Sequence, residues 1–239
     1  MACLNGSRRA SEHPRLPTRP DELATDAAAV VQLGATSLHI HPKDAQGVDT
    51  LAAAHVDAAV LAVTGAVPSV PVGVTTGAWT ARDPAERRRH IDSWTQLPHF
   101  ASLNWHEDGS LLVGHTLNDR GVLVEAGLWD VVSARRFADE VNGLEVLRVL
   151  VEPLDGALDD ALRSVHRMIE VVEPLGYPIL VHGSGPTAWG VLREALALGL
   201  DTRIGLEDTL TLPSGRRAQG NDELVRTAVG IAAGSARRW

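Results

Sequence analysis

Short apolar and β-branched runs alternate along this chain with longer segments of helical period. Eight runs have the composition of strands, at residues 2–5, 36–42, 70–76, 100–104, 121–128, 146–153, 178–183 and 202–208. Apolar spacing of three to four residues and end signals predict helices at 18–34, 158–172, 186–199 and 221–233. We therefore expect one α/β domain over residues 1–239, a (β/α)8 TIM barrel; a doubly wound open sheet is the structural alternative.

The composition supports a folded globular protein. Hydrophobic residues make up 44% and charged residues 22% of the 239 positions, enough for a sizeable core. The net charge of −8 argues against nucleic acid or an anionic membrane surface as a partner. Cys3 is the only cysteine, which excludes an intrachain disulfide. Because neither a signal peptide nor a run of about 18 apolar residues is recognisable, we expect a cytoplasmic protein.

Polar side chains gather at the carboxyl ends of the predicted strands, whereas the beginnings of the same strands are mostly apolar. These ends and the loops after them build the active site of a (β/α)8 barrel. The polar positions are Asn5, His39, His41, Thr75, Thr76, Ser102, Asn104, Glu125, Glu152, His182, Glu207 and Asp208. The asymmetry predicts that one end of the barrel carries chemistry.

The stretch TSLHIHPKD places His39 and His41 two residues apart in a predicted strand. Alternate strand residues face the same side, so both imidazoles point the same way, about 6.5–7 Å apart along the strand. Glu207, at the end of the last predicted strand, is the best candidate for a third ligand. Two histidines and a carboxylate with an open position are typical of catalytic zinc sites, and other divalent ions also suit them. The alternative is a pair of surface or hydrogen-bonded histidines.

The stretch RIGLED carries a second candidate group. Arg203 and Glu207 share one face of the predicted strand, and Asp208 lies where the strand ends. An arginine–aspartate pair near a metal can position a carboxylate as a general base. The alternative is a structural salt bridge across the barrel mouth. The nearby turn HGSG, residues 182–185, suits either a phosphate cradle or a plain tight turn.

Several blocks together resemble the β-keto acid cleavage enzymes, and the resemblance extends over nearly the whole chain. The blocks are LNGSRRASEHPRLPTRPDEL (4–23), LHIHPKD (38–44), TTGA (75–78), ASLN (101–104), VEAG (124–127) and RIGLEDTLTLPSGRRAQGNDELV (203–225). The resemblance implies a zinc-bearing (β/α)8 barrel that condenses a β-keto acid with acetyl-CoA. The products would be acetoacetate and the CoA ester of the remaining acyl part.

Carried over residue by residue, the resemblance implies three groups of site residues. The metal ligands are His39, His41 and Glu207. Asp208 is the catalytic carboxylate, with Arg203 as its partner. The expected substrate-binding residues are Thr75, Thr76, Ser102, Asn104, Glu125, Lys43 and His182.

Three departures from the family pattern bear on the substrate. Arg8 stands where typical members have an acidic residue, Lys43 stands where they have an arginine, and the loop HGSGPT (182–187) lacks an arginine. The alternatives are therefore a metal-dependent aldolase or lyase that acts on a keto acid without CoA, and a non-catalytic metabolite-binding barrel. The expected partners are a β-keto acid and a CoA thioester, bound by a homo-oligomer.

Overall fold

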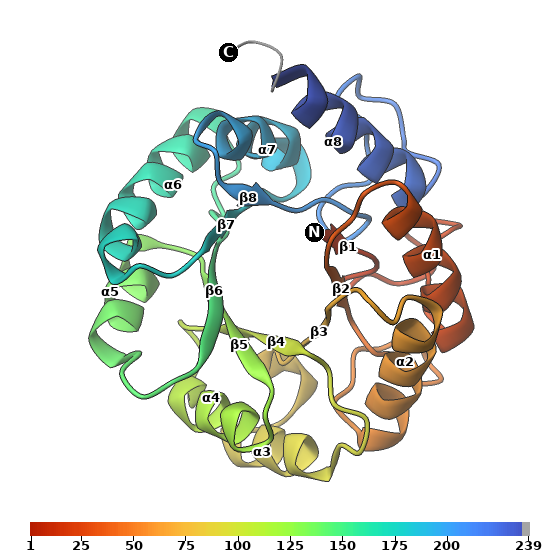
Figure 1. Ribbon diagram of the computed structural model, residues 1–239, viewed down its shortest axis with the longest axis vertical. Helices are drawn as coiled ribbons and strands as arrows, with labels where there is room; N and C mark the ends of the chain where they lie inside the picture. Colours follow the sequence, from red (N-terminus) through yellow and green to blue (C-terminus); the bar gives the residue numbers. More distant parts are fainter. Residues whose placement is uncertain (236–239) are drawn as a thin grey trace.

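The computed structural model describes residues 1–235 and has the predicted architecture, a (β/α)8 barrel (Figure 1). Residues 236–239 of the predicted domain lie outside this range. The strands are β1 Ala2–Cys3, β2 Leu38–Ile40, β3 Val72–Thr75, β4 Phe100–Asn104, β5 Leu123–Leu128, β6 Val146–Val151, β7 Ile179–Val181 and β8 Asp201–Thr202. The α-helices are α1 Pro20–Gln32, α2 Ala53–Ala66, α3 Pro84–Ser93, α4 Ser110–Asp119, α5 Val131–Glu140, α6 Leu158–Val172, α7 Ala188–Ala197 and α8 Asn221–Ser235.

The strands pair in parallel and in chain order from β1 to β8, and the helices form an outer ring around them (Figure 1). A doubly wound sheet requires a reversal of strand order, so this order rules that alternative out. The core lies mainly between strands and helices. Helix α6 shows the pattern, since its buried Ala161, Val165, Met168 and Val172 recur at spacings of three and four. Within residues 1–235, no helix combines the length and hydropathy needed to cross a bilayer.

The segment after β8 closes the barrel against β1. Ala2 and Ile204 form a parallel bridge, and the Glu207 N–H donates to the Cys3 carbonyl at 3.3 Å. The backbones approach so closely that a Cβ at position 205 would lie 1.9 Å from the Cys3 oxygen. Only glycine therefore fits at position 205, because any side chain would force the two segments apart.

Asn221, the first residue of α8, ties the closing segment in place. Its buried side-chain oxygen accepts the Leu206 N–H at 2.7 Å. Its amide nitrogen donates to the Leu4 carbonyl and to Asp26, each at 2.7 Å. Leaving such a buried amide unpaired costs about 1–3 kcal/mol, so this residue specifies where the segment around Leu206 lies.

The predicted strand over residues 202–208 is wrong in its extent, because β8 ends at Thr202. Beyond the single bridge at Ile204, the chain bends into a turn in which the N–H groups of Asp208 and Thr209 both donate to the Gly205 carbonyl at 3.0 Å. Glu207 and Asp208 are thus turn residues. Strand alternation no longer applies to them, which allows neighbouring carboxylates to face the same space.

We expect Gly205→Ala to destabilise the fold by about 1–3 kcal/mol, the usual cost of overpacking a core. The added Cβ would collide with the Cys3 carbonyl. Equilibrium unfolding in urea measures the change. The matched control is Gly230→Ala in α8, where nothing lies within 4 Å of the added Cβ. The control should gain about 0.5–1 kcal/mol, because alanine is the better helix former. Equal effects of the two substitutions would contradict the requirement for glycine at position 205.

Candidate metal centre and surrounding cavity

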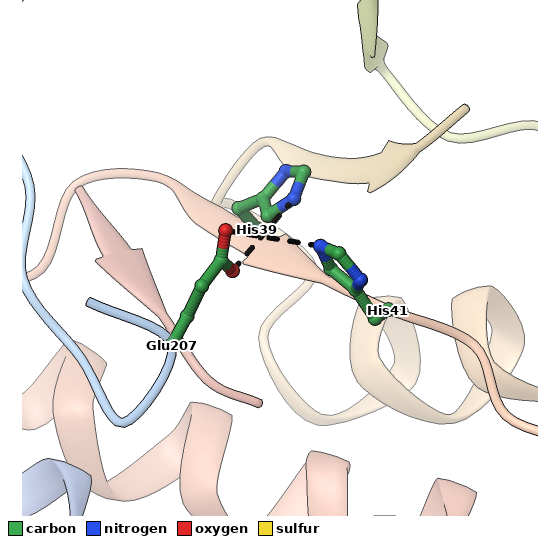
Figure 2. A group of neighbouring side chains, drawn as sticks. All are labelled: His39, His41 and Glu207. Carbon is green, nitrogen blue, oxygen red and sulfur yellow. Dashed lines mark ion pairs between the residues drawn. The ribbon is translucent and has the colours of Figure 1, made fainter. Parts of the chain in front are cut away.

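His39 lies on β2 and His41 follows directly after it, and both rings point into the barrel (Figure 2). Both side chains are buried, with ring centroids 5.1 Å apart in an edge-to-face arrangement. Asn5, just beyond β1, holds the backbone of His41. Its amide donates to the His41 carbonyl and its oxygen accepts the His41 N–H, both at 2.8 Å. Two strand ends therefore set the positions of the rings.

Glu207 reaches the two histidines from the turn after β8. Figure 2 shows its carboxylate facing both rings, with Oε2 3.8 Å from Nε2 of His39 and Oε1 3.7 Å from Nε2 of His41. Among residues 1–235, these three form the one cluster of histidine, cysteine or carboxylate side chains that can hold a metal ion. One ligand atom from each lies within 4.8 Å of the others.

The spacing of these atoms fits a divalent cation better than direct hydrogen bonds. Distances of 3.7 and 3.8 Å exceed hydrogen-bond range. Zinc ligands lie about 2.0–2.1 Å from the ion, which places two tetrahedral ligands about 3.4 Å apart. Oε2 of Glu207 is buried and has no hydrogen-bond partner in the described part of the chain. A buried carboxylate oxygen left without a hydrogen bond beside an imidazole nitrogen is available to bind a metal ion.

Burial lowers the pKa of both histidines, but nearby carboxylates oppose it unequally. For His41, Glu207 and the hydrogen bond to Asp49 outweigh burial and raise the pKa to about 9. For His39, burial outweighs Glu207 and lowers the pKa to about 4. Burial would raise the pKa of Glu207, yet Arg203 and the histidines hold it well below its usual range. At neutral pH and without a bound ion, His39 is therefore neutral, Glu207 ionised and His41 protonated, so binding of a metal at Nε2 of His41 would release a proton.

Arg203 holds Glu207 and Asp208 at the edge of the same cavity. Its Nη2 lies 2.8 Å from Oε1 of Glu207 and 2.9 Å from Oδ1 of Asp208, and its Nε donates to the same Oδ1 at 3.1 Å. The other oxygen of Asp208, Oδ2, is buried without a hydrogen-bond partner among the described residues. Asp208 thus keeps one oxygen fixed and one free to accept a proton.

These groups line a cavity of about 500 Å³ at the carboxyl ends of the strands, a volume typical of small-molecule sites. The predicted site residues that line it are His39, His41, Thr75, Ser102, Asn104, Arg203, Glu207 and Asp208. Trp79, Trp129, Leu150 and Leu154 supply apolar wall. The structure thus places the eight predicted residues, from the carboxyl ends of β2, β3 and β4 and from the segment after β8, around one cavity.

Three predicted substrate-binding residues bind protein groups behind the cavity wall. The Thr76 hydroxyl donates to the Ser102 carbonyl at 2.7 Å. Lys43 is buried, and its ammonium donates to Asp49 at 2.6 Å and to the Gly6 carbonyl at 2.8 Å. Glu125 is fully buried and forms an ion pair of 2.6 Å with Arg148 of β6. The structure does not bring these three side chains to the cavity.

His182, the fourth predicted residue outside the cavity lining, is buried between two carboxylates. Its Nδ1 lies 3.3 Å from Asp208 and its Nε2 3.4 Å from Glu152. Burial and Arg203 lower the pKa of His182, but Glu152 and Asp208 outweigh them and raise it to about 9. In the following HGSG turn, the Gly185 N–H donates to the Asp208 carbonyl at 2.7 Å. Strand β7 and its turn thus support Asp208 from behind.

Glu152 and Asp49 belong to the site, but neither was assigned a role from the sequence. Glu152, directly after β6, lines the cavity, and its position at a strand end was a signal for it. Asp49 lies behind His41, and burial of its carboxyl is outweighed by His41 and Lys43, which lower its pKa to about 2. The one sequence signal for Asp49 was Lys43 itself, because a buried ammonium needs a carboxylate nearby.

The fold and this cavity define a (β/α)8 barrel with a two-histidine, one-glutamate candidate metal centre at its carboxyl end. The sequence matches the family described as beta-keto acid cleavage enzyme over residues 1–112 and 115–238. The chain therefore belongs to that family, which confirms the resemblance. It is similar to the 3-keto-5-aminohexanoate cleavage enzyme of Fusobacterium nucleatum subsp. nucleatum, 24% identical over 248 residues that cover 97% of this chain and 89% of the relative.

The solved structures similar to this chain share its fold. The binary complex of ObcA with oxaloacetate has a TM-score of 0.76 at 19% identity, covering 93% of this chain and 64% of that chain. The ternary complex of ObcA with C4-CoA adduct and oxalate has a TM-score of 0.75 at 20% identity, with 93% and 65% covered. This chain thus spans less than two thirds of the ObcA chains. The 3-dehydroquinate dehydratase of Geobacillus kaustophilus has a TM-score of 0.65 at 13% identity, with 98% and 90% covered.

We expect the purified protein to bind one divalent ion per chain and His39→Ala to lose that ion, because two remaining ligands cannot hold it. Equilibrium dialysis followed by elemental analysis measures the stoichiometry. The matched control is His166→Ala on α6, which removes a surface histidine paired with Glu194 at 2.8 Å and should keep the full metal content. Full retention by His39→Ala would refute the assignment of the ligands.

Proposed function

We propose that this chain is a zinc-dependent β-keto acid cleavage enzyme that works by acyl transfer to coenzyme A. It would convert a β-keto acid and acetyl-CoA into acetoacetate and the CoA ester of the remaining acyl part. The observation that carries the proposal is the convergence of the three candidate metal ligands with the free carboxylate oxygen of Asp208 in one cavity.

The relatives support the choice of substrate class. The curated relative bears the name of a keto acid cleavage enzyme. ObcA binds oxaloacetate, which is itself a β-keto acid, and a C4-CoA adduct. A β-keto acid and a CoA thioester are therefore the substrates that membership of this family favours for the cavity described above.

The donor set of two imidazoles and one carboxylate favours zinc. A divalent cation held by His39, His41 and Glu207 would act as a Lewis acid toward the carboxylate and keto oxygens of the substrate. Thr75 on β3 and Ser102 on β4 line the same cavity and offer hydroxyl groups to these oxygens. The strands fix these groups before substrate arrives, which lowers the cost of ordering the complex.

Asp208 is suited to act as the general base. Its Oδ2 has no competing hydrogen bond, while Arg203 fixes its Oδ1 and so orients the whole carboxylate. A base must lie within hydrogen-bond reach of the proton it removes. A substrate bound with its carbon 2 at the edge of the cavity beside Glu207 would bring that proton to the free oxygen of Asp208.

The reaction balances as an exchange of acyl groups. Removal of a proton from carbon 2 by Asp208 yields a carbanion, which attacks the thioester carbonyl of acetyl-CoA and expels the CoA thiolate. The thiolate attacks the original keto carbon, and the bond between carbons 2 and 3 breaks to release the new CoA ester. Asp208 returns its proton to carbon 2 of the departing acetoacetate, so no external acid or oxidant is consumed.

We expect Asp208→Asn to lower kcat/KM by about 10²–10⁴-fold, the usual contribution of a positioned general base. Zinc content should stay at the wild-type level, because Asp208 is not among the candidate ligands. The assay combines zinc-loaded protein, acetyl-CoA and a panel of β-keto acids, and measures acetoacetate and new CoA esters. The matched control is Asp119→Asn, an exposed carboxylate at the end of α4.

Two results would contradict the proposal and favour its alternatives. Cleavage of the keto acids at equal rate without acetyl-CoA would favour an aldolase or lyase. Binding of β-keto acids without any turnover across the panel would favour a non-catalytic metabolite-binding barrel.

A further inference from the structure

Asp49 accepts hydrogen bonds from three side chains directly behind the candidate metal centre. Its Oδ2 accepts from Nδ1 of His41 at 2.8 Å and from the Trp79 indole at 3.0 Å. Its Oδ1 accepts from the Lys43 ammonium at 2.6 Å. The side chains of Asp49 and Lys43 are 3% and 0% exposed, so water does not compete for the ion pair between them.

The hydrogen bond between His41 and Asp49 decides which ring nitrogen of His41 is free to bind a metal. A neutral imidazole carries one N–H, and the carboxylate of Asp49 can only accept. In the neutral form that binds a metal, the proton therefore resides on Nδ1, and Nε2, 3.7 Å from Glu207, carries the lone pair. The same bond opposes rotation of the ring about its side-chain axis, because a rotated ring would lose this hydrogen bond and place a C–H group against the buried carboxylate.

Lys43 links Asp49 to Glu207 through the backbone of Gly6. Besides Asp49, its ammonium donates to the Gly6 carbonyl at 2.8 Å. Gly6 has a φ of +56°, and a Cβ there would lie 2.5 Å from Cγ of Glu207. The backbone at Gly6 thus packs directly on Glu207. One buried ammonium thereby holds the supports of two candidate ligands, His41 through Asp49 and Glu207 through Gly6.

Trp79 links Asp49 to the wall of the cavity. Its ring stacks on His41 with 6.2 Å between centroids and 17° between planes, and the same ring lines the cavity. A Cβ at position 77 would lie 2.1 Å from the Trp79 ring, so Gly77 allows the indole to lie there. The indole and the imidazole are thus held side by side by one carboxylate.

We propose that Asp49, held by Lys43 and Trp79, is the positioning residue of the metal centre. Asp49 presents Nε2 of His41 to the ion and couples that ligand to the wall against which substrate binds. The inference rests on the metal centre of the proposed function and adds a role for residues outside the ligand set. It differs from a purely structural ion pair, in which Asp49 would only neutralise Lys43.

Zinc affinity in the absence of substrate tests this role. We expect Asp49→Asn to raise the Kd for zinc about 10–100-fold, the usual effect of removing a carboxylate behind a ligating histidine. Competition with a chromophoric chelator measures the Kd, and the visible spectrum of cobalt-loaded protein reports the ligand geometry, which should change. If Asp49 only neutralised Lys43, Asp49→Asn would lower the Tm of the protein. The Kd for zinc and the cobalt spectrum would then keep their wild-type values.

Two tryptophan variants form a matched pair. Trp79→Phe removes one hydrogen bond to Asp49 and keeps an aromatic ring, so the Kd for zinc should rise, but less than in Asp49→Asn. Trp129→Phe is the control, because Trp129 lines the same cavity while its indole nitrogen has no hydrogen-bond partner within residues 1–235. Its Kd for zinc should equal that of the wild type. Equal Kd values for the two variants would overturn the role of Trp79.

Asp49→Asn leaves the buried Lys43 without its counter-charge, and that variant can fail to fold. The double variant Lys43→Met, Asp49→Asn removes both charges and should fold, with zinc still bound about 10–100-fold more weakly than in the wild type. A wild-type Kd in either folded variant would overturn the inference while leaving the proposed function intact. Failure of the wild-type protein to bind zinc would overturn both.

Discussion

The close approach of residues 204–207 to β1, where Gly205 packs against the Cys3 carbonyl, is the contact on which the rest of the structure depends. Cys3 pairs with His39 of β2 on one side and accepts the Glu207 N–H on the other. Strand β1 thus contacts both segments that supply the candidate metal ligands, β2 and the turn after β8. Residues nearly 170 positions apart meet because the barrel closes at this point. Any change that spreads this junction would also spread the ligands.

Hydrogen bonding around the site separates supporting groups from groups that remain free. Asn5, Asn221 and Arg203 use their polar atoms to hold backbone or carboxylates in place. Oε2 of Glu207 and Oδ2 of Asp208 are buried without a hydrogen-bond partner in the described chain. Buried unpaired polar atoms cost free energy and are rare in native cores. Their concentration in one cavity indicates that this end of the barrel is arranged for a ligand rather than for stability.

Much of the architecture was predictable because it depends on local periodicity. Strand β4 and helix α6 have the boundaries that apolar spacing predicted. The site was less predictable where a side chain's direction depends on neighbours. Thr75 and Thr76 are adjacent at the end of β3, so alternation requires them to face opposite ways, but only the barrel decides that Thr75 faces the cavity. Glu125 likewise could not be placed without knowledge of Arg148 on the next strand.

The sequence by itself determined the order of the strands, four of the eight α-helices within residues 1–235, the shared direction of His39 and His41, and membership of the family, because these follow from spacing and from residue identity along the chain. Only the tertiary structure decided that Lys43 faces Asp49 and that Glu207 and Asp208 lie in a turn. These outcomes depend on burial and on pairing between distant segments. A buried charged side chain pairs with an opposite charge, and here the partner comes from a segment whose position is fixed only when the barrel closes.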